Sequence, residues 1–324
     1  MQSKLRGQNT VKSIVEVYRT IISKWHGAEG RFQVVAAPSG PQRCTDDLLI
    51  ALNELATEFN LPVHTHALET LTQLAAGNEL YGKTIIRHMY DLGLLSKRVS
   101  LAHSIWVTEE DIALLAESGV SVVHNPVSNL SLGSGIMPLK RLLDAGVNVC
   151  LGTDGISASG ALNMFEAMKL ALLIQRITGT DYRKWPTGAQ VLRMATGNGA
   201  RAVGLGETVG SLAPGKKADL IVLDLAAANY VPLYEVGDQI VLSETGSSVN
   251  TVVVNGRLLL EDGNILICNE KELLEEAREI ALETKSVVVR SHDFSSQLKP
   301  YVEQVYRRCA AGARAIERLA IGAE

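Results

Sequence analysis

The sequence predicts an α/β fold in which parallel strands are joined by helices, and three observations support this class. Short apolar segments alternate with single helix-patterned segments between residues 32 and 152. Polar residues suited to chemistry follow the ends of these apolar segments. None of the apolar segments is followed by the glycine-rich phosphate loop that a dinucleotide-binding fold requires.

The predicted strands are runs of six or seven mostly apolar residues, at 32–38, 61–66, 98–103, 120–125 and 147–152. Segments with apolar residues at helical spacing separate them, at 46–59, about 70–94, 108–118 and 137–145. Thr45 and Thr108 precede acidic residues and are expected to cap two of these helices. Because a helix between two strands makes a crossover connection, we expect neighbouring strands to be parallel.

Residues with chemical potential lie where these strands end. His66, His103 and His124 close or nearly close three strands, and Asp154 follows the last one. A TIM barrel and an open doubly wound sheet both place their sites at the carboxyl ends of strands, so position alone leaves both folds open. The absence of a phosphate loop after any strand favours the barrel.

The pattern changes after about residue 190. The segments 209–225 and 249–265 alternate apolar and polar residues and contain the turn signals PG, NG and DG, which predict a small β domain. Residues 270–290 and 294–319 are expected to be helices with charged faces that pack in contact with solvent; a contact between copies is the alternative. The predicted divisions are a partial barrel at 1–205, a β-sandwich segment at 206–268 and C-terminal helices at 269–324.

Composition excludes several classes of partner. The 324 residues are 46% hydrophobic, and 31 Lys and Arg stand against 35 Asp and Glu. This mildly acidic balance argues against nucleic acid, and the apolar runs are too short to span a membrane. Four separated cysteines and a start without the apolar core of a signal peptide predict reduced thiols and a cytoplasmic location. The expected partner is therefore a small molecule.

The segment LPVHTHALET carries the first chemical signal. His64 and His66 lie two residues apart and share one face of a strand, and Glu69 follows on the loop. Neutral imidazole suits Zn²⁺ or Fe²⁺, and a carboxylate that is not itself a ligand can move the proton of a metal-bound water. His66 alone would be explained as a hydrogen-bonded core histidine, but its combination with Glu69, His103 and Asp154 favours a metal hydrolase site.

Four motifs taken together resemble the amidohydrolase superfamily. They are HxxE at 66–69, AHSIW at 102–106, HNPVSN at 124–129 and GTDG at 152–155. More narrowly they are similar to its branch of cytosine, guanine and adenosyl-type deaminases and triazine chlorohydrolases, over residues from about 30 to 265. The resemblance implies a (β/α)₈ barrel, one divalent ion, Zn²⁺ or Fe²⁺, and hydrolysis of a non-peptide C–N bond in a heterocyclic amine.

The resemblance also implies a role for each site residue. His66 and Asp154 correspond to metal ligands, and Asp154 also to a catalytic base. Glu69 corresponds to the proton shuttle, and His103 to a catalytic histidine beside or on the metal. The residues expected to bind substrate are His124, Asn129 and Trp106, with ordinary packing as the alternative for Trp106. A homo-oligomer is expected only by analogy with the family.

The number of strands that follow His66 decides which part of the barrel is present. Three strands follow, so the resemblance makes His66 the ligand of strand five and 32–38 strand four; His64 and His66 are then not the metal-binding pair of strand one. We therefore expect the C-terminal part of the barrel, strands four to eight, in a chain truncated at its N-terminus relative to the family. Two functions stay open: an active amidohydrolase, and a remnant without activity unless another chain supplies the missing half.

Overall fold

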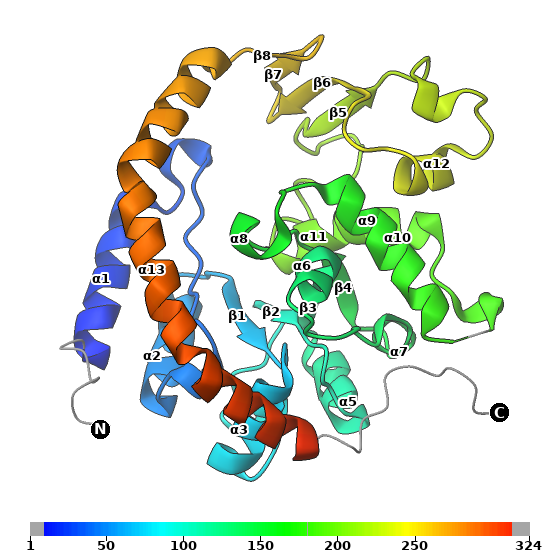
Figure 1. The fold of residues 1–324 in the computed structure, drawn as a ribbon. Coiled ribbons are helices and arrows are strands. Elements are labelled where there is room, and N and C mark those ends of the chain that lie inside the picture. The colour runs from blue at the N-terminus through cyan, green and yellow to red at the C-terminus, as the bar shows by residue number, and fades with distance from the viewer. Residues whose placement is uncertain (1–9, 180, 313–324) are drawn as a thin grey trace.

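The computed structural model describes residues 10–179 and 181–312, and a parallel sheet lies at its centre (Figure 1). The sheet has four strands in the order β1-β2-β3-β4, and each pairs with the next in parallel. These strands are β1 (Val63–Ala67), β2 (Val99–His103), β3 (Ser121–His124) and β4 (Asn148–Leu151). The α/β class and the parallel pairing predicted from the alternating pattern are confirmed for these four strands.

Helices connect the strands and cover the sheet. Those up to β4 are α1 (Val11–Trp25), α2 (Asp46–Glu58), α3 (Leu71–Tyr81), α4 (Ile85–Asp91), α5 (Glu109–Ser118), α6 (Pro126–Ser131) and α7 (Leu139–Asp144). Those after β4 are α8 (Ile156–Ser159), α9 (Met164–Leu173), α10 (Gly188–Ala195), α11 (Gly197–Ala202), α12 (Val236–Leu242) and α13 (Glu270–Gly312). Short 3₁₀ turns are η2 (Ala28–Gly30), η3 (Pro41–Arg43), η4 (Ile174–Ile177), η5 (Tyr182–Lys184) and η6 (Ala228–Tyr230).

Side-chain caps set where the helices begin. Thr45 Oγ1 accepts a hydrogen bond from the Leu48 amide at the start of α2. Thr108 and Asp111 form a reciprocal capping box at the start of α5. Each cap satisfies amides that have no partner inside the helix, which contributes about 1 kcal/mol. Both threonines predicted as caps are confirmed.

The predicted strand at 32–38 is largely absent, which corrects the expectation of five strands. Only Ala36 bridges to Val63: the Ala36 amide donates to Pro62 O, and the His64 amide donates to Ala36 O. The next ladder bonds on either side would need amide donors from Pro38 and Pro62, and proline has none. Side chains hold the segment instead, because Thr65 Oγ1 donates to Pro38 O.

The core lies around β2, whose five residues are all buried. Large apolar side chains from the strands, their loops and the covering helices fill the space beside it; among the most buried are Leu55, Leu61, Leu68, Ile85, Ile86, Leu101, Ile105, Leu115, Met137, Leu139 and Leu142. Burial of one such side chain contributes about 1.5–3 kcal/mol, so these contacts hold the strand ends in place.

A second, antiparallel sheet follows in the order β5-β6-β7-β8. Its strands are β5 (Leu220–Leu223), β6 (Val249–Val254), β7 (Arg257–Glu261) and β8 (Asn264–Ile265). Asn255 and Gly256 both have positive φ in the turn between β6 and β7, and Asp262 and Gly263 do so in the next turn. The turn signals NG and DG therefore mark the two hairpins, since such turns need this conformation.

Helix α13 runs from this second sheet along one side of the molecule to α3 (Figure 1). It is one helix of 43 residues, whereas two helices with a break near 290–294 were expected, so that prediction is wrong. Residues 313–319 of the second expected helix lie outside the described residues. No helix in the described ranges has the length and apolar character needed to cross a bilayer.

His88 is also a correction. Its polar helical context predicts a surface residue, but it is buried: its ring stacks on Tyr81 with 3.7 Å between centroids. His88 Nε2 lies 2.9 Å from Asp46 Oδ1. The partners come from α2 and α3, and the local sequence of α4 does not reveal them. His26 and His292, expected at the surface for the same reason, are exposed.

Candidate active site

The predicted site residues gather at the carboxyl end of the parallel sheet. His66, His103 and His124 lie in β1, β2 and β3, and the register places Ala67 opposite His103. His103 (φ 73°) and Asp154 (φ 60°) adopt left-handed backbone conformations, which are uncommon outside glycine. Such strained residues cluster at sites where the surrounding structure fixes a side-chain direction.

His103 is at the centre of this group. Its Nε2 lies 3.9 Å from Glu69 Oε2 and 3.9 Å from Asp154 Oδ2. Its Nδ1 donates to Asn129 Oδ1 at 2.8 Å, which fixes the ring and leaves Nε2 toward the two carboxylates. The structure thus brings together Glu69, His103, Asp154 and Asn129, which the sequence predicts as site residues.

Asp154 is held by two hydrogen bonds. Ser128 Oγ donates to Asp154 Oδ2 at 2.5 Å, and the Gly155 amide donates to Asp154 Oδ1 at 2.6 Å. Burial alone would raise the pKa of this carboxyl, but these bonds and the nearby His103 and His66 outweigh it and lower the pKa below its usual value. The carboxylate is therefore kept ionised and oriented.

The glycine of GTDG before Asp154 has a steric role. A Cβ on Gly152 would stand 2.4 Å from Asn125 Oδ1 and 2.8 Å from Val123 Cγ1. Only glycine lets the end of β4 approach the end of β3 this closely. The motif therefore brings Asp154 within reach of Ser128 on α6, which follows β3.

Glu69 is held from the loop between α6 and α7. Ser134 Oγ donates to Glu69 Oε1 at 3.4 Å. Trp106 Nε1 donates to Ser134 O at 2.9 Å, and a Cβ on Gly135 would crowd the Trp106 ring. Trp106 therefore anchors this loop beside Glu69. This is a packing role, which was the alternative to the substrate-binding role expected from the sequence.

Ser128 and Ser134 hold the two carboxylates, and neither was predicted from the sequence as a site residue. Ser128 lies inside the HNPVSN motif, where only His124 and Asn129 were assigned roles. Ser134 is not among the residues to which the sequence assigns a role. Ser128 directly precedes the predicted site residue Asn129, and a hydroxyl group next to a predicted site residue is the signal that could have pointed to it.

His66 presents one free nitrogen to the site. Its Nδ1 donates to Ser39 O at 2.6 Å, so Nε2 carries the lone pair. Its ring stacks on that of His103, with centroids 5.6 Å apart and planes 19° apart. His64 shares this face, with Nδ1 2.8 Å from Ser100 Oγ. Burial lowers the pKa of His64, and the neighbouring His66 and His103 lower it further.

His124 is buried, and neither ring nitrogen has a hydrogen-bond partner among the described residues. Burial lowers the pKa of His124 to about 3, with a further contribution from nearby His103. The imidazole is therefore neutral at ordinary pH. A buried polar group without a partner costs about 1–3 kcal/mol, which is typical of a group reserved for a ligand.

A metal ion needs more ligands than this group supplies. Within 10–179 and 181–312, no three His, Cys, Asp or Glu side chains converge closely enough to hold one. Catalytic zinc sites have about three protein ligands. The side chains described here therefore do not complete a metal site by themselves.

Comparison with known proteins decides the family. Residues 6–259 match the family described as "Amidohydrolase family". A 5′-deoxyadenosine deaminase from Methanosarcina mazei is 37% identical over 279 residues, which cover 86% of this chain and 63% of the relative. The chain belongs to the amidohydrolase family. The predicted resemblance is confirmed.

Other relatives of this amidohydrolase agree. A 5-methylthioadenosine/S-adenosylhomocysteine deaminase from Moorella thermoacetica is 40% identical over 82% of this chain and 62% of the relative. The solved structure of a zinc-bound adenosine deaminase from Xanthomonas campestris has a TM-score of 0.81 and 31% identity over 85% of this chain and 62% of that one. The solved structure of zinc-bound atrazine chlorohydrolase TrzN from Arthrobacter aurescens has a TM-score of 0.80 and 27% identity, over 83% of this chain and 60% of that one. The chain thus spans somewhat under two thirds of the length of these relatives.

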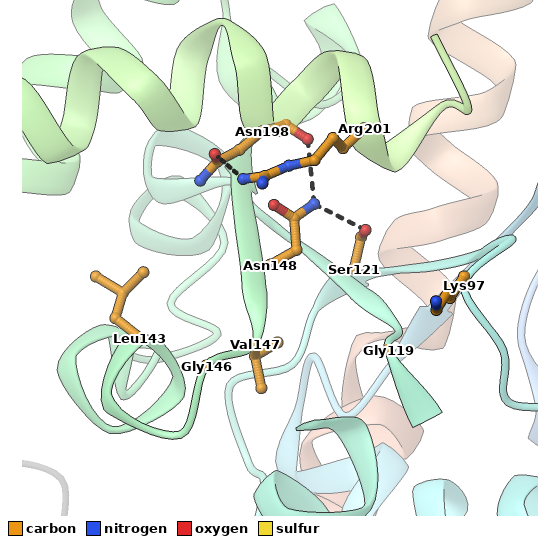
Figure 2. A pocket seen from close by; sticks show the side chains of 9 residues that line it. All are labelled: Lys97, Gly119, Ser121, Leu143, Gly146, Val147, Asn148, Asn198 and Arg201. Carbon is orange, nitrogen blue, oxygen red and sulfur yellow. Dashed lines mark hydrogen bonds between the residues drawn. The ribbon is translucent and has the colours of Figure 1, made fainter. Parts of the chain in front are cut away.

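The amidohydrolase also has a cavity of about 500 Å³ at the opposite end of the sheet (Figure 2). Ser121 begins β3 and Asn148 begins β4, and Asn148 Nδ2 donates to Ser121 Oγ at 2.9 Å. The other lining residues are Lys97, Gly119, Leu143, Gly146, Val147, Asn198 and Arg201. Because this cavity lies at the amino ends of the strands, it is separate from the group around His103.

Proposed function

We propose that this chain carries an amidohydrolase active site that hydrolyses a non-peptide C–N bond and releases the amino group of a heterocyclic ring. The observation that carries the proposal is the placement of His103 Nε2 3.9 Å from both Glu69 and Asp154. The 5′-deoxyadenosine and 5-methylthioadenosine/S-adenosylhomocysteine deaminases among the relatives support a purine nucleoside as substrate.

The geometry suits proton transfer in both directions. Asp154, kept ionised, acts as the base that takes a proton from the attacking water. Glu69 delivers a proton to the ring or leaving group, and His103, whose Nδ1 is held by Asn129, presents Nε2 to both carboxylates. His124, Asn129 and Trp106 surround this group and are the proposed substrate-binding residues.

A divalent ion, zinc rather than iron, is the proposed cofactor, because two similar solved structures contain zinc. His66 Nε2 and Asp154 are the proposed ligands from this chain, with His103 beside or on the ion. In such a site the ion would make water a stronger acid. At least one further ligand is needed, since the described side chains do not converge as a set of three.

The arrangement also supports a proposal for the fold. We propose that residues 1–205 correspond to strands four to eight of a (β/α)₈ barrel, with the segment around Ala36 in the place of strand four. Residues 206–268 then correspond to part of a β-sandwich, and the single helix α13 (Glu270–Gly312) follows it. The parallel order of β1 to β4 and the TM-scores near 0.8 support this correspondence.

A second candidate is a half-site that has no activity unless another chain completes it. It is supported by the absence of three converging metal-binding side chains in the described ranges. The sequence has one H-x-H pair, His64 and His66, and both residues lie on β1. His64 Nδ1 is already bonded to Ser100 Oγ, so this pair does not act as a pair of metal ligands in the second candidate.

Zinc loading and ammonia release separate the two candidates. The whole chain is loaded with Zn²⁺, unbound metal is removed, and ammonia release from 5′-deoxyadenosine and S-adenosylhomocysteine is measured. The first candidate predicts retained zinc and ammonia release, both lost in Asp154→Ala and both kept in His292→Ala, a change at an exposed histidine. Retained zinc without ammonia release supports the second candidate. If the chain retains no zinc and releases no ammonia, the first candidate is contradicted.

A further inference from the structure

Helix α13 carries an apolar stripe that faces solvent. Large apolar side chains recur every seven residues along it, at Leu273, Ile280, Val287, Phe294 and Tyr301. Each of the five is more than half exposed. A repeat of seven keeps one face of a helix toward a partner helix, which is the pattern of a coiled coil.

More side chains widen this stripe on the same face. They are Leu274, Val288, Leu298, Val302 and Val305, and all are exposed. The helix spans about 65 Å at 1.5 Å per residue. Its main packing contact in the described chain is with α3, where Arg308 Nη2 donates to Glu79 Oε1 at 2.9 Å. An exposed apolar strip of this length is typical of an interaction surface.

The charges on α13 are divided about Val287. Before it stand six glutamates against the cations Lys271, Arg278 and Lys285. After it the cations Arg290, Lys299, Arg307 and Arg308 stand against Asp293 and Glu303. One half of the helix is therefore acidic and the other basic. Two such helices attract when antiparallel and repel when parallel.

We propose that two copies of this chain pair through α13 as an antiparallel two-helix coiled coil, with the two-fold axis at Val287. The heptad series is symmetric about that residue, so Leu273 packs against Tyr301 of the partner subunit and Ile280 against the partner's Phe294. Glu283 then lies beside Arg290 of the partner subunit, and the symmetry forms this pair twice.

Light scattering on the full chain as it elutes from a size-exclusion column tests the pairing. Wild type is expected to be a dimer, and Val287→Glu, which places two like charges at the axis, is expected to be a monomer. Val289→Glu is the matched control, because its side chain lies about 200° around the helix from Val287 and so points away from the stripe. This variant is expected to remain a dimer. Circular dichroism checks that both variants keep their helix content. A monomeric wild type, or equal effects of the two variants, would overturn the proposal.

Native cysteines test the orientation. Cys268 lies just before α13 and is exposed, and Cys309 lies near its C-terminal end. In the antiparallel pair Cys268 comes within about one helical turn of the level of the partner's Cys309. A short thiol cross-linker should therefore join Cys268 to Cys309 between copies. Cross-links only between two Cys268 residues would show a parallel pair and overturn the antiparallel arrangement.

Charge reversal gives a second test of orientation. Glu283→Arg alone and Arg290→Glu alone should each weaken the dimer, because like charges then face each other. The double variant should restore the wild-type dissociation constant, since each pair is re-formed with its charges exchanged. A double variant weaker than either single variant would contradict the proposed register.

Discussion

His103 and Glu69 approach each other across two neighbouring strands, with His103 Nε2 3.9 Å from Glu69 Oε2. Asp154 Oδ2 lies at the same distance from this nitrogen. Two carboxylates around one imidazole can pass protons to and from a substrate held between them. The arrangement depends on hydroxyl groups and on tight loops as much as on the site residues themselves.

Ser128→Ala should weaken catalysis without disturbing the fold. The variant removes the 2.5 Å hydrogen bond to Asp154, and a bond to a charged group contributes about 1.5–3 kcal/mol. We expect kcat/KM for ammonia release to fall about 10-fold to 100-fold. Ser131→Ala, on the exposed side of the same helix, is the control and should leave kcat/KM unchanged. Equal values for the two variants would show that Ser128 does not position Asp154.

His124→Leu should separate stability from activity. Because neither ring nitrogen has a hydrogen-bond partner in the described part of the chain, replacing the ring with an apolar side chain should raise the free energy of unfolding by about 1 kcal/mol at neutral pH. Turnover should fall, since His124 is proposed to face the substrate. Urea unfolding and ammonia release measure the two effects, and a large loss of stability would mean that the imidazole has a structural partner.

The same variant should change the dependence of stability on pH. The pKa of His124 is lowered from 6.5 to about 3, so below pH 6.5 the unfolded chain binds a proton that the native chain does not. This costs wild type about 1.4 kcal/mol for each pH unit below 6.5. His124→Leu removes the cost, and its advantage in free energy of unfolding should grow as the pH falls from 6.5 toward 5.5. A constant difference over this range would contradict the neutral state.

Glu244→Gln should destabilise the part of the chain around α12. The buried carboxylate accepts hydrogen bonds from Tyr230 Oη at 2.7 Å and from the Gly246 amide at 2.7 Å. Burial alone would raise the pKa of Glu244, but these bonds outweigh it and lower the pKa. The stabilisation is therefore present above the ordinary pKa of 4.5 and is lost as the pH falls through the lower native value.

We expect Glu244→Gln to lower the free energy of unfolding by about 1–3 kcal/mol at neutral pH. The difference from wild type should shrink below pH 4.5. Chemical unfolding at several pH values measures it, with Glu261→Gln at the exposed end of β7 as control. A difference that does not depend on pH would show that the charge of Glu244 is not what stabilises the fold.

Local patterns in the sequence predicted the strands that carry the site. Apolar runs that end in or next to His66, His103 and His124 form β1, β2 and β3, because the apolar side chains of each run are buried and a polar residue follows at its end. The segment 32–38 has the same pattern but does not form a strand. The hydrogen bonds that would extend its pairing with β1 need amide donors at Pro38 and Pro62, and proline has none. Which residues must donate depends on the pairing register, which the sequence does not show.

Contacts between distant elements could not be predicted in this way. The bonds of Ser128 to Asp154 and of Ser134 to Glu69 join residues 26 and 65 positions apart. The burial of His88 depends on Tyr81 and Asp46 in other helices. Two helices, at 270–290 and 294–319, were expected at the end of the chain, but residues 291–293 are exposed and continue α13 as one helix.

Glu69→Gln separates metal binding from proton transfer at the site. The side chain keeps its size but can no longer exchange a proton, and Glu69 is not proposed as a ligand. Zinc content and ammonia release are measured on the same zinc-loaded preparation. We expect zinc content equal to wild type, with turnover lowered about 10²-fold to 10⁴-fold. Loss of zinc from the variant, or turnover equal to wild type, would contradict this expectation.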